Sequence, residues 1–253
     1  MPSLRLRRQP PPFRLVEVVG TERLSPRMVR VTLGGPELEG FAVDQPAASV
    51  RLLLPSPGTH DLVIPSWNGN EFLLPDGRRP AIRTFTPHWS GAELSVDVVL
   101  HGHGVASEWA GTARPGDRAA VSGPGRGYAV DRDAPGFLLA GDETAIPAIG
   151  QLLEVLPDGC PVEVHVEIAD DAARLPLPAE WHALPPGARP GEALVAAVTS
   201  TDLAPGTRVW VAGEAAAVQR IRKHLFQHLG LPRTQATVRG YWKHGRAGDA
   251  EGD

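Results

Sequence analysis

The hydrophobic pattern of the chain changes near residue 135, and this change limits the possible folds more than any other feature. The first part contains short β-branched segments with no convincing long helix between them. These segments are residues 15–19, 28–33, 49–54, 94–100 and 119–122. Short strands joined by turns rich in Gly and Pro are typical of a small antiparallel barrel. The stretch 56–80, rich in Pro, Gly and Asn, predicts a long loop or a lid.

After residue 135, strands and helices alternate. The predicted strands are 137–140, 162–168, 208–212 and 236–242, and the predicted helices are 145–156 and 214–229. The apolar stripe of the second helix comprises Val218, Ile221, Leu225 and Leu229. This alternation predicts a Rossmann-like parallel sheet with right-handed crossovers. We therefore predict a β-barrel domain over 1–132 and an α/β domain over 133–253, the latter with a C-terminal strand and tail.

The composition excludes several classes of function. The net charge is −4, whereas a general nucleic-acid binder needs a basic surface. No run of about 18 apolar residues occurs, so no membrane span is predicted. The basic N-terminus lacks the apolar stretch of a secretory signal, so we expect a cytoplasmic protein. Cys160 is the only cysteine, which excludes a disulfide or a cysteine-ligated iron–sulfur cluster and leaves redox chemistry to an organic cofactor.

The segment Arg83-Thr84-Phe85-Thr86 has groups that suit a ligand with a planar ring and phosphates. Arg83 offers a fork for a pyrophosphate, Phe85 offers a flat apolar face, and the two threonine hydroxyls offer hydrogen bonds. On a strand, Arg83 and Phe85 face one way and the threonines the other, so all four reach one ligand only where the strand twists or ends. The alternative is a strand with an exposed Arg and a core Phe.

Two glycines follow the strand that ends near residue 100. Gly102 and Gly104 let the backbone approach a ligand closely. Residues 105–110 can begin a helix whose free N–H groups would receive phosphate oxygens. A plain turn is the alternative. A metal site at His101 and His103 is disfavoured, because no carboxylate or third histidine shares the expected local spacing, and we predict no metal.

Two strand ends in the second part are candidates for binding a dinucleotide. Gly141-Asp142-Glu143-Thr144 is a strand-to-helix turn, although it lacks the Gly-x-Gly-x-x-Gly pattern. The two acids would repel phosphate, so the backbone and Thr144 are the favoured donors; alternatively, Asp142 caps a helix. Gly213 and Glu214 end a later strand, where Glu214 orients a nicotinamide carboxamide or simply begins a helix. A crevice between the two domains would allow two stacked rings to exchange a hydride.

These motifs occur in an order that makes the chain, from about Phe13 to Gly245, resemble the siderophore-interacting protein family. This family comprises FAD-containing ferric-siderophore reductases of the ferredoxin–NADP reductase superfamily. The motifs are Leu24-Ser25-Pro26-Arg27-Met28, Arg83-Thr84-Phe85-Thr86, Val98-Val99-Leu100-His101-Gly102, Trp109-Ala110 with Pro115-Gly116-Asp117, Gly123-Pro124, Ala140-Gly141-Asp142-Glu143-Thr144-Ala145, Trp210-Val211-Ala212-Gly213-Glu214 and Gly240-Tyr241-Trp242-Lys243.

The resemblance implies that the first domain binds FAD and the second NADPH or NADH. FAD would contact Arg83, Thr84, Phe85, Thr86, Val99, Leu100, His101, Gly104, Ala106 and Ser107. The nicotinamide nucleotide would contact Gly141, Asp142, Glu143, Thr144, Gly213 and Glu214. We assign Thr86 and Glu214 to the reacting rings. The choice between the nucleotides stays open, because Asp170 and Asp171 suit a ribose 2′-hydroxyl and Arg174 suits a 2′-phosphate.

Two positions depart from the family pattern, which usually has Tyr at position 85 and Arg at position 88. Phe85 keeps the stacking surface but lacks the hydroxyl, which is expected to alter flavin affinity or potential. His88 is basic only when protonated. A basic pocket for an anionic ferric siderophore would comprise Arg51, His88, Arg126 and Lys243, although ordinary solvated charge is the alternative.

The resemblance implies hydride transfer from the nicotinamide to the flavin, followed by single-electron transfer to ferric iron. Ferrous iron would then leave, because it binds hard oxygen chelators more weakly. Two rival functions remain: a general flavin reductase or electron-transfer flavoprotein with a protein donor of the ferredoxin type, and a carrier of flavin or siderophore without turnover. We expect a monomer.

Overall fold

The computed structural model describes residues 10–56, 58–59 and 61–245, and the chain divides into two compact units. Unit 1 comprises Met1–Glu22, Val29–Val43 and Ala48–Arg126. Unit 2 comprises Arg23–Met28, Asp44–Ala47 and Gly127–Asp253. Two short early segments thus belong to the second unit. The basic N-terminus and the tail after residue 245 lie outside the described residues.

Unit 1 is built on a seven-stranded sheet with the order β6-β3-β9-β1-β2-β8-β7. Its strands are β1 (Arg14–Ser25), β2 (Met28–Gly34), β3 (Val50–Leu54), β6 (Ala81–Phe85), β7 (Pro87–Trp89), β8 (Leu94–Val99) and β9 (Arg118–Ser122). The β1–β9, β3–β6, β3–β9 and β7–β8 pairings are antiparallel, as predicted. Alternate residues of these strands form the core, among them Val31, Leu33, Leu94 and Val96. A 3-10 turn (Pro36–Leu38) and helix α1 (Val105–Thr112) complete the unit.

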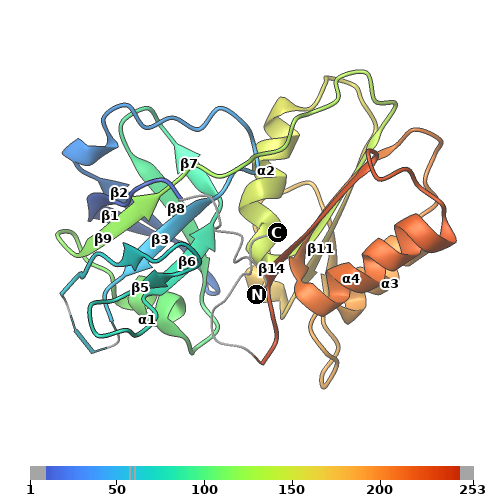
Figure 1. The fold of residues 1–253 in the computed structure, drawn as a ribbon. Helices are drawn as coiled ribbons and strands as arrows, with labels where there is room; N and C mark the ends of the chain where they lie inside the picture. The colour runs from blue at the N-terminus through green and yellow to red at the C-terminus, as the bar shows by residue number, and fades with distance from the viewer. Residues whose placement is uncertain (1–9, 57, 60, 246–253) are drawn as a thin grey trace, which may run out of the picture. The chain divides into compact units, whose positions relative to one another are not determined.

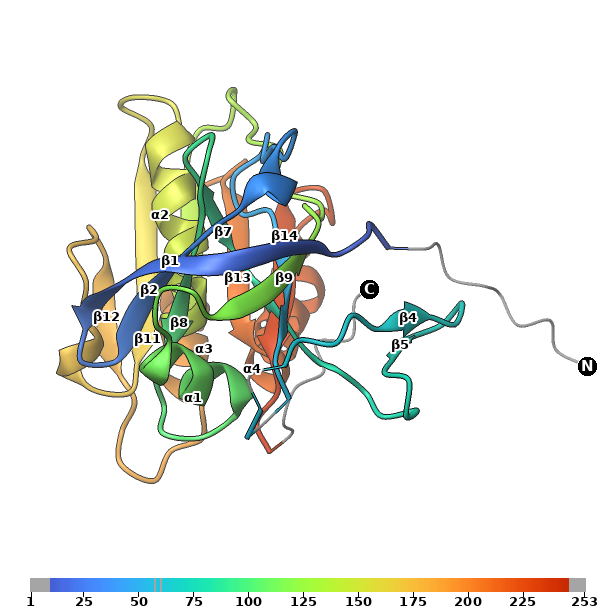
Figure 2. The same cartoon turned by 90° about the vertical axis from the view of Figure 1, so that its left-hand side faces the viewer.

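The stretch 56–80 is not wholly a loop. It contains a small hairpin of β4 (Ser66–Trp67) and β5 (Phe72–Leu73), which Figure 2 shows set apart from the seven-stranded sheet. The Trp67 and Phe72 rings meet edge to face at 5.1 Å. The side chain of Asn68 accepts hydrogen bonds from the backbone of Asn70 and Glu71 and closes the turn. Two-residue strands leave too little alternation for the sequence pattern to reveal them.

Unit 2 is a five-stranded sheet with the order β12-β11-β10-β13-β14, and its pairings are parallel, as predicted. The strands are β10 (Phe137–Asp142), β11 (Val162–Ile168), β12 (Glu180–Ala183), β13 (Arg208–Glu214) and β14 (Ala236–Trp242). The helices are α2 (Ile146–Val155), α3 (Glu192–Ser200) and α4 (Ala215–Lys223), with 3-10 turns at Glu143–Ala145 and Asp171–Ala173. Figure 1 shows α2 on one face of this sheet and α3 and α4 on the other.

Three features of unit 2 differ from the prediction. Strand β12 and helix α3 were not predicted. Leu229, placed in the apolar stripe of the last helix, is 46% exposed, whereas Val218, Ile221 and Leu225 are buried. The reason is a π-helical turn over His224–His228, in which the N–H of Leu229 bonds to the carbonyl of His224 at 3.0 Å. The wider turn shifts Leu229 off the stripe.

Within the described part of the chain, no helix is both long and apolar enough to cross a membrane.

Candidate functional site

Strand β6 carries most of the segment with the sequence Arg83-Thr84-Phe85-Thr86 at an edge of the sheet of unit 1. Arg83 and Phe85 are two residues apart on the strand and so share a face. Arg83 lies opposite the buried Leu52, and Phe85 packs against the core. Thr84 lies opposite Arg51, and both are exposed on the other face. The strand ends at Phe85, and Thr86, which is 7% exposed, follows it. A guanidinium and an aromatic ring are thus presented on one side.

The turn between β8 and α1 is shaped by two glycines. Gly102 and Gly104 have φ values of 82° and 85°, in the left-handed region that other residues avoid. The backbone N–H of His101 donates to Ser107 Oγ at 3.1 Å, which holds the turn against the first helical residues. Helix α1 begins directly after Gly104, which has no side chain with which to cap it. Its first N–H groups therefore suit a phosphate.

Val99 and Leu100 are half-buried beside this turn, as is Ala106 in the first turn of α1. The rings of His101 and His103 lie 4.3 Å apart. The residues from Val99 to Ala106 thus lie together where β8 leads into α1. The predicted roles of these residues in FAD binding stay predictions.

His88 belongs to a charged cluster on β7, β2 and β8. The buried carboxylate of Asp97 receives two hydrogen bonds from Arg30, at 2.7 and 2.9 Å, and lies 3.0 Å from His88 Nε2. Burial opposes the ionisation of Asp97, but the bonds from Arg30 and His88 outweigh it and lower the pKa of the carboxyl. One ring nitrogen of His88 therefore faces this carboxylate.

Asp97 gives the protein an expected loss of stability in acid. Because its folded pKa is lowered, its contribution is full above its unfolded pKa and is lost as the pH falls below about 4. The contribution changes by up to about 1.4 kcal/mol per pH unit. We expect Asp97→Asn to flatten the dependence of the Tm on pH in this range. The control Glu93→Gln removes an exposed acid before the same strand; slopes that are equal in wild type and Asp97→Asn would refute the assignment.

One buried carboxylate joins the carboxyl ends of β10, β13 and β14. Asp142 Oδ1 accepts hydrogen bonds from the backbone N–H of Thr144 at 2.9 Å and from its hydroxyl at 2.5 Å. Asp142 Oδ2 accepts from the N–H of Glu214 and from Trp242 Nε1, both at 2.8 Å. Burial outweighs these bonds and raises the pKa of Asp142. Its side chain caps the following turn and ties three strand ends together.

The other two acids at this edge also have protein partners. Glu143 receives bonds from Arg27 Nε at 3.1 Å and from the N–H of Ala169 at 2.7 Å. Glu214 accepts from the N–H of Ala217 at 2.9 Å and so caps α4. Arg27 was not predicted as part of the site, although its motif, residues 24–28, was among those that suggested the family.

Two glycines bring the backbone of these strand ends close together. A Cβ on Gly141 would lie 2.8 Å from the carbonyl oxygen of Ala212 and 2.3 Å from Ala145 Cβ. A Cβ on Gly213, whose φ is 153°, would lie 2.6 Å from Asp142 Oδ2. Both positions therefore require glycine. The N–H groups of Thr144 and Glu214 and the Thr144 hydroxyl all bond to Asp142, so the favoured donors are engaged in this structure as the acids are. The roles of residues 141–144 and 213–214 in nucleotide binding stay predictions.

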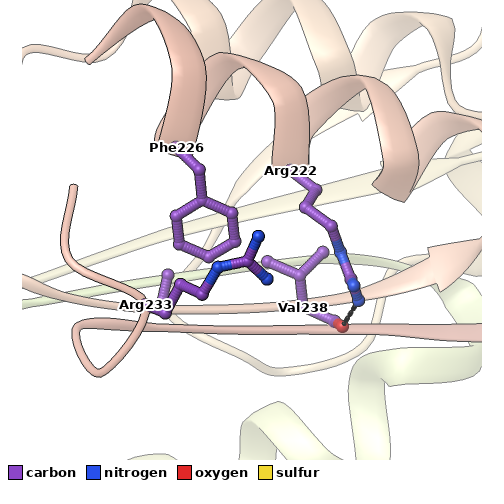
Figure 3. Close-up of a pocket in the computed structure, with 5 residues that line it drawn as sticks. Arg222, Phe226, Arg233 and Val238 are labelled. Carbon is purple, nitrogen blue, oxygen red and sulfur yellow. Dashed lines mark hydrogen bonds between the residues drawn. The ribbon is translucent and has the colours of Figure 1, made fainter. Parts of the chain in front are cut away.

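A pocket of about 190 Å³ lies elsewhere in unit 2, between α4 with its π-helical extension and β14. Figure 3 shows the guanidinium of Arg233 against the Phe226 ring, with Arg222 bonded to the carbonyl of Val238. The Arg233 guanidinium carbon lies 5.6 Å from the centroid of the Phe226 ring, and Arg222 Nη2 donates to the carbonyl of Val238 at 2.7 Å. Its lining includes none of the predicted site residues described here. The proposed basic residues Arg51, Arg126 and Lys243 are all exposed.

Two family models match most of the chain. The siderophore-interacting FAD-binding domain matches residues 17–128, and the siderophore-interacting protein model matches residues 134–245. The chain belongs to the siderophore-interacting protein family. The first matched domain is an FAD-binding domain, so FAD is a cofactor of this chain.

Relatives match over nearly the whole length. An uncharacterized protein of Mycobacterium tuberculosis is 37% identical over 93% of this chain and 92% of its own. The ferric vibriobactin reductase ViuB of Vibrio cholerae is 30% identical over 94% of this chain and 92% of its own. A siderophore utilization protein from T. fusca has a solved structure with a TM-score of 0.81 and 36% identity, covering 96% and 97% of the two chains. The family relationship therefore spans both units.

The fold itself extends to more distant proteins. Phthalate dioxygenase reductase has a TM-score of 0.59 at 14% identity, covering 94% of this chain and 70% of its own. At this identity the likeness concerns the fold alone. It is the ferredoxin reductase-like arrangement of an antiparallel β unit followed by a parallel α/β unit, as the sequence predicts.

Unit 1 contains groups that FAD requires. Phe85 and Arg83 lie on the same side of β6, where Phe85 packs against the core and Arg83 Nη1 donates to the carbonyl of Ile82 at 2.8 Å. The uncapped start of α1 supplies N–H groups behind two positive-φ glycines. An isoalloxazine ring and a pyrophosphate need this combination of an apolar face and anion donors.

Proposed function

We propose that this protein is an oxidoreductase that reduces ferric siderophores with electrons from NADH or NADPH, carried by FAD. The observation that carries the proposal is the alignment with ferric vibriobactin reductase over 94% of this chain. When bound, FAD would supply a site that takes up the two electrons of a hydride and passes them on one at a time to two ferric ions in turn. The iron arrives enclosed by its chelator and leaves as ferrous iron, which hard oxygen ligands hold more weakly.

The residues of unit 1 serve to position the flavin and the acceptor. In this proposal, Arg83 and the start of α1 hold the pyrophosphate, and Phe85 covers the ring with Thr86 beside it. The exposed side chains of Arg51 and Arg126 supply positive charge for an anionic complex, together with His88. Lys243, which belongs to unit 2, is a separate candidate for the same role. Because the chelator already surrounds the iron, the protein needs charge and shape rather than iron ligands.

In unit 2, the proposed contacts to the nicotinamide nucleotide come from the strand ends at residues 141–144 and 213–214, where Thr144 would exchange its bonds to Asp142 for bonds to the nucleotide. Asp142 and Glu214 support these strand ends through their own hydrogen bonds. Arg174 is paired with Asp171 at 2.8 Å, and Asp170 accepts from the N–H of Ala172 at 2.8 Å. Both candidate groups for recognising the ribose are therefore engaged locally, and each nucleotide has to be tested.

An anaerobic titration tests the proposal. The purified protein is expected to be yellow and to bleach on addition of NADH or NADPH. Reoxidation by a ferric catecholate siderophore is then expected to release ferrous iron, measured with a ferrous-specific chromogenic chelator. The iron-free siderophore is the matched control and should leave the flavin reduced.

Each contrary result points to another function. Failure of both nucleotides to bleach the flavin would refute the hydride step and favour a ferredoxin-type protein donor. Bleaching followed by reoxidation with neutral dyes but not with ferric siderophores would indicate a general flavin reductase. A protein that binds the siderophore but never bleaches with any donor would be a carrier.

A further inference from the structure

Two histidines and a glutamate meet on β11 and β12 of unit 2. The side chains of His165, His182 and Glu180 bring three ligand atoms within 4.8 Å of one another. None of the three is assigned to FAD, to the nucleotide or to the acceptor. The parallel pairing sets His165 opposite Glu180, and His182 follows Glu180 by two residues on the same face.

The separations between these atoms suit a metal ion. His165 Nδ1 lies 2.9 Å from His182 Nε2 and 3.6 Å from Glu180 Oε2. His182 Nε2 lies 4.0 Å from Glu180 Oε1. Tetrahedral ligands at about 2.0–2.2 Å from zinc are about 3.3–3.6 Å apart. Small side-chain rotations on the edge strand β12 are therefore enough to reach this geometry.

The hydrogen bonds of His165 prepare it for such a role. Its Nε2 lies 2.7 Å from Glu163 Oε1 and 3.2 Å from Thr201 Oγ1. In the tautomer protonated on Nε2, His165 donates a hydrogen bond to Glu163, and the lone pair on Nδ1 is directed at His182. Metal-ligating histidines are oriented by this kind of carboxylate bond. Two facing ring nitrogens need either a shared proton or a cation between them.

The surroundings favour a cation and leave it a path from solvent. The side chain of His165 is only 4% exposed, whereas those of His182 and Glu180 are 20% and 69% exposed. Thr201 follows α3 directly and bonds to the carbonyl of Ala197 in its last turns. The carbonyl end of a helix carries partial negative charge. Together with Glu163 and Glu180, it offsets the charge of a divalent ion.

We propose that His165 Nδ1, His182 Nε2 and the carboxylate of Glu180 bind one divalent transition-metal ion, with Glu163 orienting His165. Water would fill the remaining coordination position on the exposed side. Two imidazoles and one carboxylate favour zinc, cobalt or ferrous iron over magnesium or calcium, which prefer oxygen ligands alone. The ion would cross-link the short strand β12 to β11.

Calorimetric titration of the FAD-loaded, chelator-treated protein with zinc tests this site. Wild type is expected to bind one equivalent and to gain a higher Tm in zinc. His182→Ala and Glu180→Gln should weaken binding at least about tenfold, and Glu163→Gln about 10–100-fold, as loss of an orienting carboxylate does. Magnesium should give no saturable binding.

His228→Ala is the matched control, because His224 and His228 form a second histidine pair, with ring centroids 5.9 Å apart. It should leave zinc binding unchanged. Absence of zinc binding in wild type, unchanged binding in both His182→Ala and Glu180→Gln, or loss of binding in His228→Ala alone would each overturn the proposal. Flavin content and circular dichroism report folding independently of zinc binding, so a variant that misfolds is recognised. If His182→Ala misfolds, the zinc affinity of Glu180→Gln tests the site, because the side chain of Glu180 is exposed.

Discussion

Replacing Asp142 by alanine is expected to lower the free energy of unfolding by about 2–5 kcal/mol, because several hydrogen-bond donors lose their acceptor at once. Its carboxylate accepts four hydrogen bonds, from Thr144, Glu214 and Trp242. Without it, the buried N–H of Glu214 loses its acceptor, which costs about 1–3 kcal/mol, and the half-buried indole N–H of Trp242 loses its partner as well. Equilibrium unfolding in urea measures the change.

Asp158→Ala is the control for this variant. Asp158 is exposed in the turn after α2, and its loss should change stability by no more than about 0.5 kcal/mol. If the Asp142 variant were as stable as the Asp158 variant, the carboxylate would not be what joins β10, β13 and β14. Reduction of the flavin by nicotinamide should also fail in Asp142→Ala, because Thr144 and Glu214 lose their anchor.

The parts of the fold that the sequence predicts are those with a strong local pattern. The strand at 137–140 could be recognised because it is a continuous apolar run, and the helix at 145–156 because of its composition. Strand β12 could not, since its four residues, Glu180 to Ala183, are too few for their polar and apolar alternation to stand out, and they pair with β11. Helix α3 lies in a stretch rich in Ala, Gly and Pro, where the helical period is weak.

Among the contacts of the candidate site, those between residues close in the sequence could be predicted, and those between distant residues could not. Capping by Asp142 was one of two interpretations open from the sequence, because its acceptor lies within a few residues of the donor. For Glu214 the sequence offered only a place at the start of a helix, and its capping bond was not predicted. The bond between Arg27 and Glu143 joins residues 116 positions apart, so no local pattern reveals it. The pair of His165 and His182 escaped for a further reason, namely that one of its two strands was not predicted.

Strand alternation did separate the residues of β6 correctly. Arg83 and Phe85 share one face, and Thr84 lies with Arg51 on the other. The strand ends at Phe85, which was one of the two conditions for Thr86 to join the same ligand. What alternation does not reveal is which face meets the flavin, and substitution of Arg83 addresses that question directly.

Arg83→Ala is expected to weaken FAD binding by about 10–100-fold, because a charge-assisted hydrogen bond contributes about 1.5–3 kcal/mol and 1.4 kcal/mol corresponds to a factor of ten. The variant should purify with less flavin, and titration of the apoprotein with FAD, followed by quenching of flavin fluorescence, gives the dissociation constant. Arg83→Lys keeps the charge without the planar fork and should fall between wild type and alanine.

Riboflavin distinguishes a contact to the pyrophosphate from a general loss of structure, because it has the ring but no phosphate. Its affinity should be equal in wild type and Arg83→Ala if the guanidinium meets only the pyrophosphate. Arg78→Ala is the matched control, since Arg78 is exposed and paired with Asp76 at 2.7 Å in the preceding turn. Equal FAD affinity in Arg83→Ala and Arg78→Ala would place the pyrophosphate elsewhere, and the start of α1 would then be its main anion donor.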